Sequence, residues 1–169
     1  MKGLTKKINY TGVLQGLVNI EPYLAFILLL LVSCYVFWPL LLAPNNYYPL
    51  SADGMGHLSK IKYMAECLKQ GNWPSWFPYW YCGTDVVQYY PPLSYYLLIP
   101  VQYIFDNVMI TFKFSVVFSF LIGSLGVWYI CYRWIGPITG IVAGSLYLLQ
   151  PILIRLVICH GALAQGLVI

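Results

Sequence analysis

The chain has 169 residues, of which 60% are hydrophobic and only 8% are charged. A soluble domain carries roughly 25% charged residues, so this composition cannot supply the polar surface of a water-soluble protein and indicates an integral membrane protein. The formal net charge of +4 is small, and the lysines and arginines form no cluster, which excludes nucleic acid as an expected partner.

The first apolar segment runs from residue 23 to residue 43 and contains no charge. A helix of this length reaches roughly 31 Å, enough to cross the hydrocarbon core of a bilayer. Residues 1–22 precede it as a polar segment with three lysines, which favours a cytoplasmic N-terminus. We therefore predict that residues 23–43 form the first transmembrane helix.

Residues 44–90 form a long loop, rich in aromatics and proline, on the extracytoplasmic side. Within it, apolar residues recur every three or four positions between 55 and 70, which predicts an amphipathic helix on the membrane surface. Gly71 and Pro74 mark its end. The aromatic segment 73–81 suits the headgroup layer, or a site that stacks a sugar or an isoprenoid.

The five cysteines contain no C-x-x-C pair, so a zinc or thioredoxin-like site is not expected. Cys67 and Cys82 lie in the same loop and would be able to pair in an oxidising compartment.

Further apolar segments follow at residues 91–105, which are short and contain a proline, at 112–132, and at 136–150. The last is rich in small residues, which let helices approach closely in lipid. Residues 151–169 begin another apolar segment that stops in mid-pattern, so we expect a truncated chain. The expected fold is all-α and polytopic, with about four transmembrane helices and one extracytoplasmic loop that contains a surface helix.

Asp53 is the candidate catalytic residue. It precedes the surface helix, so its carboxylate would lie near the membrane but in water, where it can act as a general base. The simpler interpretation is a helix N-cap, and the two roles can coexist. His57 and Lys60 follow at one-turn spacings and are candidates to bind a phosphate or a divalent ion. An interfacial histidine is the alternative for His57, and two such ligands do not make a metal site.

Four further residues are candidates for substrate binding. Tyr89 and Tyr90 precede two prolines that restrict the backbone, and the alternative for them is an interfacial aromatic belt. Arg155 and His160 lie in an apolar stretch, where ionisable residues usually line a cavity, pair or reach the interface. A cationic pair there would suit a lipid phosphate, and a snorkelling Arg155 is the alternative.

The order of these features resembles the N-terminal region of GT-C membrane glycosyltransferases, and most of all the membrane family labelled 6-pyruvoyl-tetrahydropterin synthase-related. The resemblance covers about residues 23–169. In the last motif the family has Arg and Glu where this chain has His160 and Gln165. The motifs that carry the resemblance are Asp53-x-x-x-His57, Gly71-Asn72-Trp73-Pro74-Ser75-Trp76, Tyr89-Tyr90-Pro91-Pro92-Leu93, Tyr147 to Pro151, and His160-Gly161-Ala162-Leu163-Ala164-Gln165.

The resemblance implies an inner-membrane enzyme that transfers a sugar from a polyprenyl-phosphate carrier to an extracytoplasmic acceptor. It implies that Asp53 is the base or a metal-linked acid, so a divalent metal ion is the one cofactor it suggests. The expected partners are the polyprenyl-phosphate sugar donor and the lipid bilayer. Two other functions stay open: a transporter or channel component, and a non-catalytic membrane scaffold or remnant.

The hydrophobic segments and the family resemblance predict different sides of the membrane for residues 151–169. Four full spans after a cytoplasmic start would return residues 151–169 to the cytoplasm, whereas the resemblance places that region near the outer site. Partial insertion of residues 91–105 would reconcile the two.

Overall fold

The computed structural model describes residues 10–46, 51–80, 82–86 and 92–161, with side chains described from residue 21 onward. These residues are mostly helical, as expected, with one small antiparallel sheet. The elements in chain order are α1 (Tyr10–Val36), α2 (Trp38–Leu42), α3 (Gly54–Lys69), β1 (Trp76–Phe77), β2 (Thr84–Asp85), α4 (Pro92–Phe105), α5 (Val108–Trp134), α6 (Pro137–Leu148) and α7 (Pro151–Ile158).

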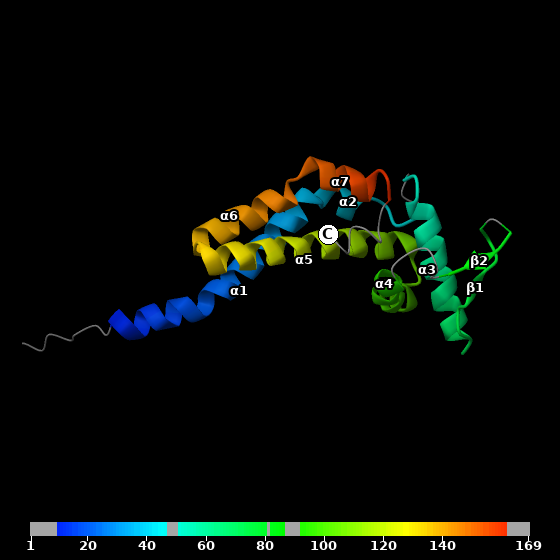
Figure 1. Ribbon diagram of the computed structural model, residues 1–169, viewed down its shortest axis with the longest axis horizontal. Coiled ribbons are helices and arrows are strands. Elements are labelled where there is room, and N and C mark those ends of the chain that lie inside the picture. The colour runs from blue at the N-terminus through cyan, green and yellow to red at the C-terminus, as the bar shows by residue number, and fades with distance from the viewer. Residues whose placement is uncertain (1–9, 47–50, 81, 87–91, 162–169) are drawn as a thin grey trace, which may run out of the picture.

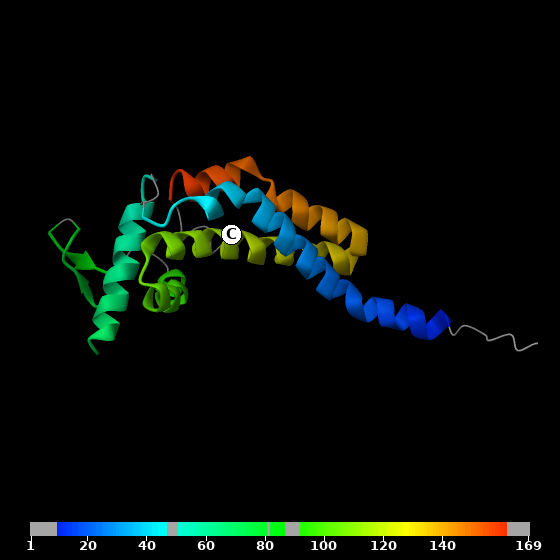
Figure 2. The same cartoon turned by 180° about the vertical axis from the view of Figure 1, so that it is seen from behind.

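Three helical runs follow the long axis of the molecule: α1 with α2, then α5, then α6 with α7 (Figure 1). The reverse view shows the same arrangement, with α1 leading away from the bundle (Figure 2). Helices α3 and α4 and the sheet gather at the end of the bundle where α2 ends, α5 begins and α7 ends. We call this end the loop end.

Among the described residues, only α5 is long and apolar enough to cross a membrane as a single helix. Helices α6 and α7 meet the same criteria together, but the chain bends by 43° between them, where Pro151 has no N–H to continue the helix. The apolar part of α1, Glu21–Val36, is shorter. The expectation of about four transmembrane helices is therefore not confirmed.

The first helix differs from the predicted span of residues 23–43. It begins at Tyr10 and accommodates Pro22. It ends at Val36, and the short α2 follows with Pro39 in its first turn. Proline removes one backbone donor from the helical ladder, which explains the break. The cytoplasmic location of the N-terminus stays a prediction.

Helix α4 does not run along α5. It is seen almost end-on in Figure 1, so it crosses the loop end of the bundle. Its 14 residues reach only about 21 Å, less than the bilayer core of about 30 Å. Residues 91–105 are thus not confirmed as a span. With α4 lying across the bundle, α5 starts at the end where α2 finishes and α7 returns to that end, which is the arrangement that partial insertion of residues 91–105 would give.

Helix α3 confirms the amphipathic helix predicted at residues 55–70. Its apolar face packs on protein, however, rather than on lipid: Leu58, Ile61 and Met64 are fully buried in one core with residues of α4 and α5. The helix stops as predicted. Gly71 adopts a φ of +75°, and hydrogen bonds from the Gly71 and Asn72 amides close the last turn, which is a Schellman ending.

Small residues bring α6 against α5, as the sequence predicts. A Cβ on Gly140 would lie 2.9 Å from the Trp128 carbonyl oxygen, and one on Gly144 would lie 3.0 Å from that of Ser124. The Ser124 hydroxyl donates a hydrogen bond to the Gly144 carbonyl at 2.9 Å. The glycines therefore permit backbone contact between the two helices.

Lys113, in the first turns of α5, has a buried position that the sequence pattern does not indicate. Its side chain is 8% exposed, and its ammonium donates to the carbonyl oxygens of Leu41 (3.0 Å) and Ala43 and to the Asn45 side-chain oxygen (2.7 Å). The Asn107 amide also donates to the Asn45 carbonyl. A lysine has three donors, so the ammonium is fully used in capping the end of α2.

We expect Lys113→Met to destabilise the folded chain by roughly 1–3 kcal/mol, because part-buried carbonyls at the end of α2 would lose their donor. The measurement is thermal unfolding in detergent micelles. The matched control is Lys62→Met, which removes only an exposed ion pair with Glu66 at 3.9 Å and should cost well under about 1 kcal/mol. Equal effects of the two changes would contradict the capping role.

Candidate functional site

The start of α3 is joined to the end of α7 by the main chain. The Ala52 amide donates to the Cys159 carbonyl at 3.2 Å, and the Asp53 amide donates to the His160 carbonyl at 2.9 Å. Two segments more than a hundred positions apart in the sequence are thus fixed side by side. We call these paired segments, residues 52–54 and 159–161, the α3–α7 junction.

Two glycines make the junction possible. Gly161 adopts a φ of +71°, and a Cβ at that position would lie 2.2 Å from the Gly54 nitrogen. A Cβ on Gly54 would lie 2.1 Å from the Ser51 hydroxyl oxygen. Only glycine gives both the left-handed conformation and the close backbone approach at Gly161.

Asp53 lies at the junction as the N-cap residue of α3, but its side chain makes no capping hydrogen bond to the helix. The side chain is exposed. The position of an N-cap is thus confirmed, and the usual hydrogen bond of an N-cap is not observed. The carboxylate faces solvent beside the end of α7, where it can accept a proton or a hydrogen bond from a ligand.

His57 lies one turn further along α3 and is only 4% exposed. Its Nδ1 lies 2.7 Å from the Tyr95 hydroxyl oxygen of α4. Burial lowers the pKa of His57 from its ordinary value of 6.5, Asp53 partly opposes this by raising it, and Lys60 lowers it further. The imidazole is therefore neutral at pH 7 and connects α3 to α4.

Lys60 is also buried, at 4% exposure, and its ammonium lies 5.0 Å from the centre of the Trp80 ring. Burial lowers the pKa of Lys60. Trp80 can approach because α3 has glycine at position 56, where a Cβ would lie 1.8 Å from the ring. A cation held over an aromatic face is attracted to it, so Lys60 fixes the segment around Trp80 on α3.

Of the two candidates near the end of α7, His160 lies beside Asp53 and Arg155 lies in the preceding turn. His160 is exposed, and its carbonyl oxygen accepts a hydrogen bond from the Asp53 amide. Arg155 is exposed in the last turn of α7, and its carbonyl accepts the Cys159 and His160 amides at 2.9 and 3.3 Å. Tyr89 and Tyr90, like Gln165, lie outside the described residues.

No group of three or more His, Cys, Asp or Glu side chains that would hold a metal ion occurs in the part of the chain that the structure describes. Asp53 and His57 by themselves do not complete a coordination sphere, so we derive no step through a metal. Cys67 and Cys82 are both free, so the pairing considered for them is not observed.

Sequence reasoning missed Tyr95 and Trp80 as partners of His57 and Lys60. Tyr95 could have been found from its spacing to Leu98 and Ile99, because all three form the buried face of α4. For Trp80, the only signal was a glycine inside an amphipathic helix, which permits a large ring to pack closely.

A family model described as "6-pyruvoyl-tetrahydropterin synthase related domain; membrane protein" matches residues 87–169. This region includes α4 to α7 and the His160–Gly161 side of the junction. Asp53, His57 and Lys60 precede it. No curated protein and no solved structure matches the chain. The match supports a membrane protein similar to this family over its second half, and the resemblance to GT-C glycosyltransferases receives no support from it.

We expect Gly161→Ala to open the junction, since the new Cβ would strain the backbone and displace Gly54. Hydrogen exchange of the Ala52 and Asp53 amides should accelerate by at least about tenfold, which corresponds to roughly 1.4 kcal/mol of lost protection. The matched control is Gly126→Ala in α5, where a Cβ would meet nothing within 4 Å. Unchanged exchange in Gly161→Ala would show that the junction does not form.

The lowered pKa of His57 predicts a pH dependence. Below pH 6.5 the histidine of the unfolded chain takes up a proton, whereas the buried His57 of the folded chain stays neutral to a lower pH. The free energy of unfolding is therefore highest above pH 6.5. It declines as the pH falls from 6.5 through the lower pKa of the folded state. Thermal unfolding should show this decline in the wild type and a flatter profile in His57→Gln. The exposed His160 provides the control: His160→Gln should retain the wild-type profile, and a wild-type profile in His57→Gln would contradict the burial of a neutral imidazole.

Proposed function

We propose that this protein is a membrane glycosyltransferase that transfers a sugar from a polyprenyl-phosphate donor to an acceptor on the extracytoplasmic face. The observation that carries the proposal is the exposed Asp53 carboxylate, which the α3–α7 junction holds at the loop end of a membrane bundle. A base in that place can reach both a lipid-linked donor and a water-soluble acceptor.

In the proposed reaction, Asp53 accepts the proton of an acceptor hydroxyl as the acceptor oxygen attacks the anomeric carbon of the donor. The bond from that carbon to the phosphate oxygen breaks, and polyprenyl phosphate leaves with the bonding electrons. A cation near the departing phosphate would stabilise its developing charge. Arg155 suits this role because it is exposed on α7 near the junction.

His57 and Lys60 receive a different role from the substrate contacts that their spacing predicts. Both are buried, and their contacts with Tyr95 and Trp80 hold α3 against α4 and against the segment around the sheet. We assign them to positioning of the helix that carries Asp53. His160 contributes its carbonyl to the junction, and its exposed ring adds a polar group on the acceptor side.

The extracytoplasmic placement of the site is part of the proposal. Three lysines lie in the first seven residues, which favours a cytoplasmic start by the positive-inside rule. With α1 leading outward and α4 lying across the bundle, Asp53 and the end of α7 share the outer face. The inner-membrane location is also part of the proposal and comes from the resemblance to the membrane family.

Transport is the competing function, and it requires polar groups that a moving solute can use. Lys113 is the buried cation of α5, and its three donors are taken by three protein oxygens. A cation bound in this way supports the structure rather than a solute pathway, which counts against transport through α5.

We expect Asp53→Asn to lower sugar transfer by about 10²–10⁴-fold, the range for loss of a general base, with membrane insertion unchanged. The assay uses protein expressed from its complete reading frame, with polyprenyl-phosphate hexoses as donors and release of polyprenyl phosphate as the readout. The matched control is Asp106→Asn, an exposed carboxylate at the same end of the bundle, which should retain transfer. Unchanged turnover in Asp53→Asn would refute the assignment.

A further inference from the structure

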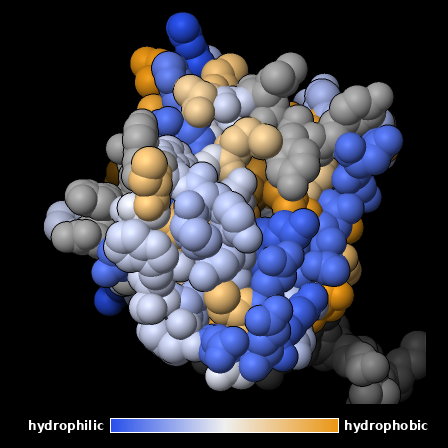
Figure 3. All heavy atoms as spheres, turned by 90° about the vertical axis from the view of Figure 1, so that its right-hand side faces the viewer, coloured by the Kyte–Doolittle hydropathy of each residue, from blue (hydrophilic) through white to orange (hydrophobic). Residues whose placement is uncertain are grey.

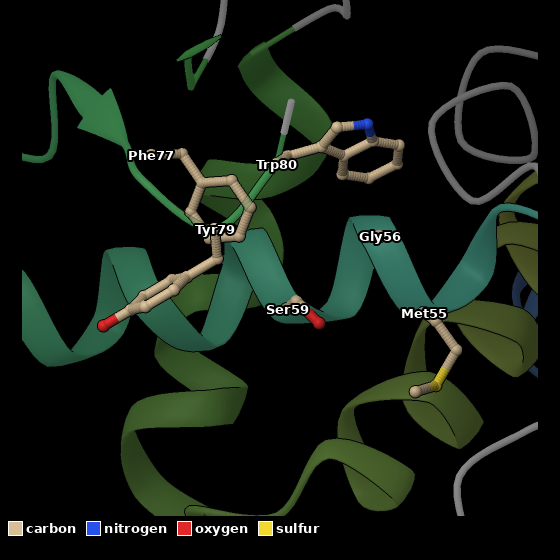
Figure 4. Close-up of a pocket in the computed structure, with 6 residues that line it drawn as sticks. All are labelled: Met55, Gly56, Ser59, Phe77, Tyr79 and Trp80. Atoms are coloured by element: carbon tan, nitrogen blue, oxygen red, sulfur yellow. The ribbon is translucent and has the colours of Figure 1, made fainter. Parts of the chain in front are cut away.

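A groove lies along the outer side of α3, one turn beyond Asp53. It has a volume of about 400 Å³. Figure 4 shows the side chains of Phe77, Tyr79 and Trp80 over α3, with Ser59 on the helix between Tyr79 and Met55. The lining residues are Met55, Gly56, Ser59, Phe77, Tyr79 and Trp80.

A second hollow of about 330 Å³ adjoins the first. The two share Ser59, Phe77 and Tyr79, and the second adds Lys62, Tyr63 and Glu66. They therefore form one groove with Tyr79 at its middle, aromatic toward Asp53 and polar further along α3. We call this the α3 groove.

The aromatic wall of the α3 groove is preformed. The rings of Tyr63, Phe77 and Tyr79 meet edge to face, with centres 5.4 to 6.1 Å apart, a favoured geometry for aromatic pairs. Pairing of β1 with β2 holds the segment that carries two of them. Tyr79 is nevertheless 80% exposed, so a rigid ring faces solvent without a large ordering cost on binding.

The polar half is nearly neutral, because Lys62 and Glu66 pair at 3.9 Å. The Glu66 carboxylate disfavours a phosphate, and an aliphatic chain would leave the charged pair without polar partners. Figure 3 shows that this end of the molecule is mostly hydrophilic or of intermediate hydropathy, with hydrophobic groups scattered among them. The groove therefore suits a neutral ligand with one apolar face and a hydroxylated edge.

A pyranose ring has this chemistry, since its C–H face stacks on an aromatic ring while its hydroxyls pair with charged and hydroxyl side chains. We propose that the α3 groove binds a hexopyranose unit of a glycan, and this deepens the proposed function by assigning the groove to the carbohydrate acceptor. The contact would place this sugar unit about 9 Å along α3 from Asp53, because Ser59 follows Asp53 by six residues.

The test measures glycoside binding by saturation-transfer NMR. The protein is expressed from its complete reading frame and placed in phosphatidylcholine nanodiscs. The probes are the methyl glycosides of glucose, galactose, mannose and N-acetylglucosamine. Tyr79→Ala removes an exposed ring, and Ser59→Phe fills the groove from α3, so each should weaken binding by about tenfold, as expected for an aromatic anchor. The matched control is Trp73→Ala, an aromatic of the same loop that is 69% exposed and outside the groove, which should bind as the wild type does.

The proposal is supported if the ring protons of a glycoside are saturated by the wild-type protein and less so by both groove variants. Absence of saturation with every glycoside, or equal saturation in Tyr79→Ala and Trp73→Ala, would overturn it. Farnesol is the competing probe: if Tyr79→Ala removes farnesol binding while no glycoside binds, the groove holds an isoprenoid and the proposal fails. Asp53→Asn separates the two proposals, because it should retain glycoside binding while losing transfer.

Discussion

The backbone contact between the start of α3 and the end of α7 determines where every other candidate group lies. Two amide hydrogen bonds and the approach of Gly54 to Gly161 hold Asp53 at the loop end of the bundle. The contact requires the ends of α2 and α7 to meet at one end of the bundle, so the chain between them must leave that end and return to it. Without it, Asp53 would be one more solvated carboxylate on a long loop.

A second set of contacts fixes α3 once the junction has positioned its first turn. His57 contacts Tyr95 of α4, Lys60 lies against the ring of Trp80, and the apolar face of the helix packs on α4 and α5. The outer side of α3 is left as one wall of the α3 groove. The same helix thus presents a carboxylate at its start and an aromatic surface along its length, which suits chemistry between a lipid-linked donor and a hydrated acceptor.

Much of the local structure could be predicted because its causes are local. Periodicity identified α3, and a glycine with positive φ ended it at Gly71. The composition of α6 predicted its close packing on α5. The direction of α4 could not be predicted, because a short apolar helix has the same sequence pattern whether it crosses a membrane or lies across a bundle. The burial of His57 and the capping by Lys113 depend on partners distant in sequence, which periodicity does not report.

The α3–α7 junction is tested most directly by a disulfide. Position 52 and the native Cys159 are both exposed, and their main chains are joined by a hydrogen bond at 3.2 Å, a contact close enough for a disulfide to be attempted between the two side chains. Mild oxidation of Ala52→Cys in membranes should form an intramolecular bond to Cys159, whereas Ser59→Cys, further along α3, should not react. A cross-link in Ala52→Cys is the predicted result. Its absence, or equal cross-linking in both variants, would contradict the placement of Asp53 beside α7.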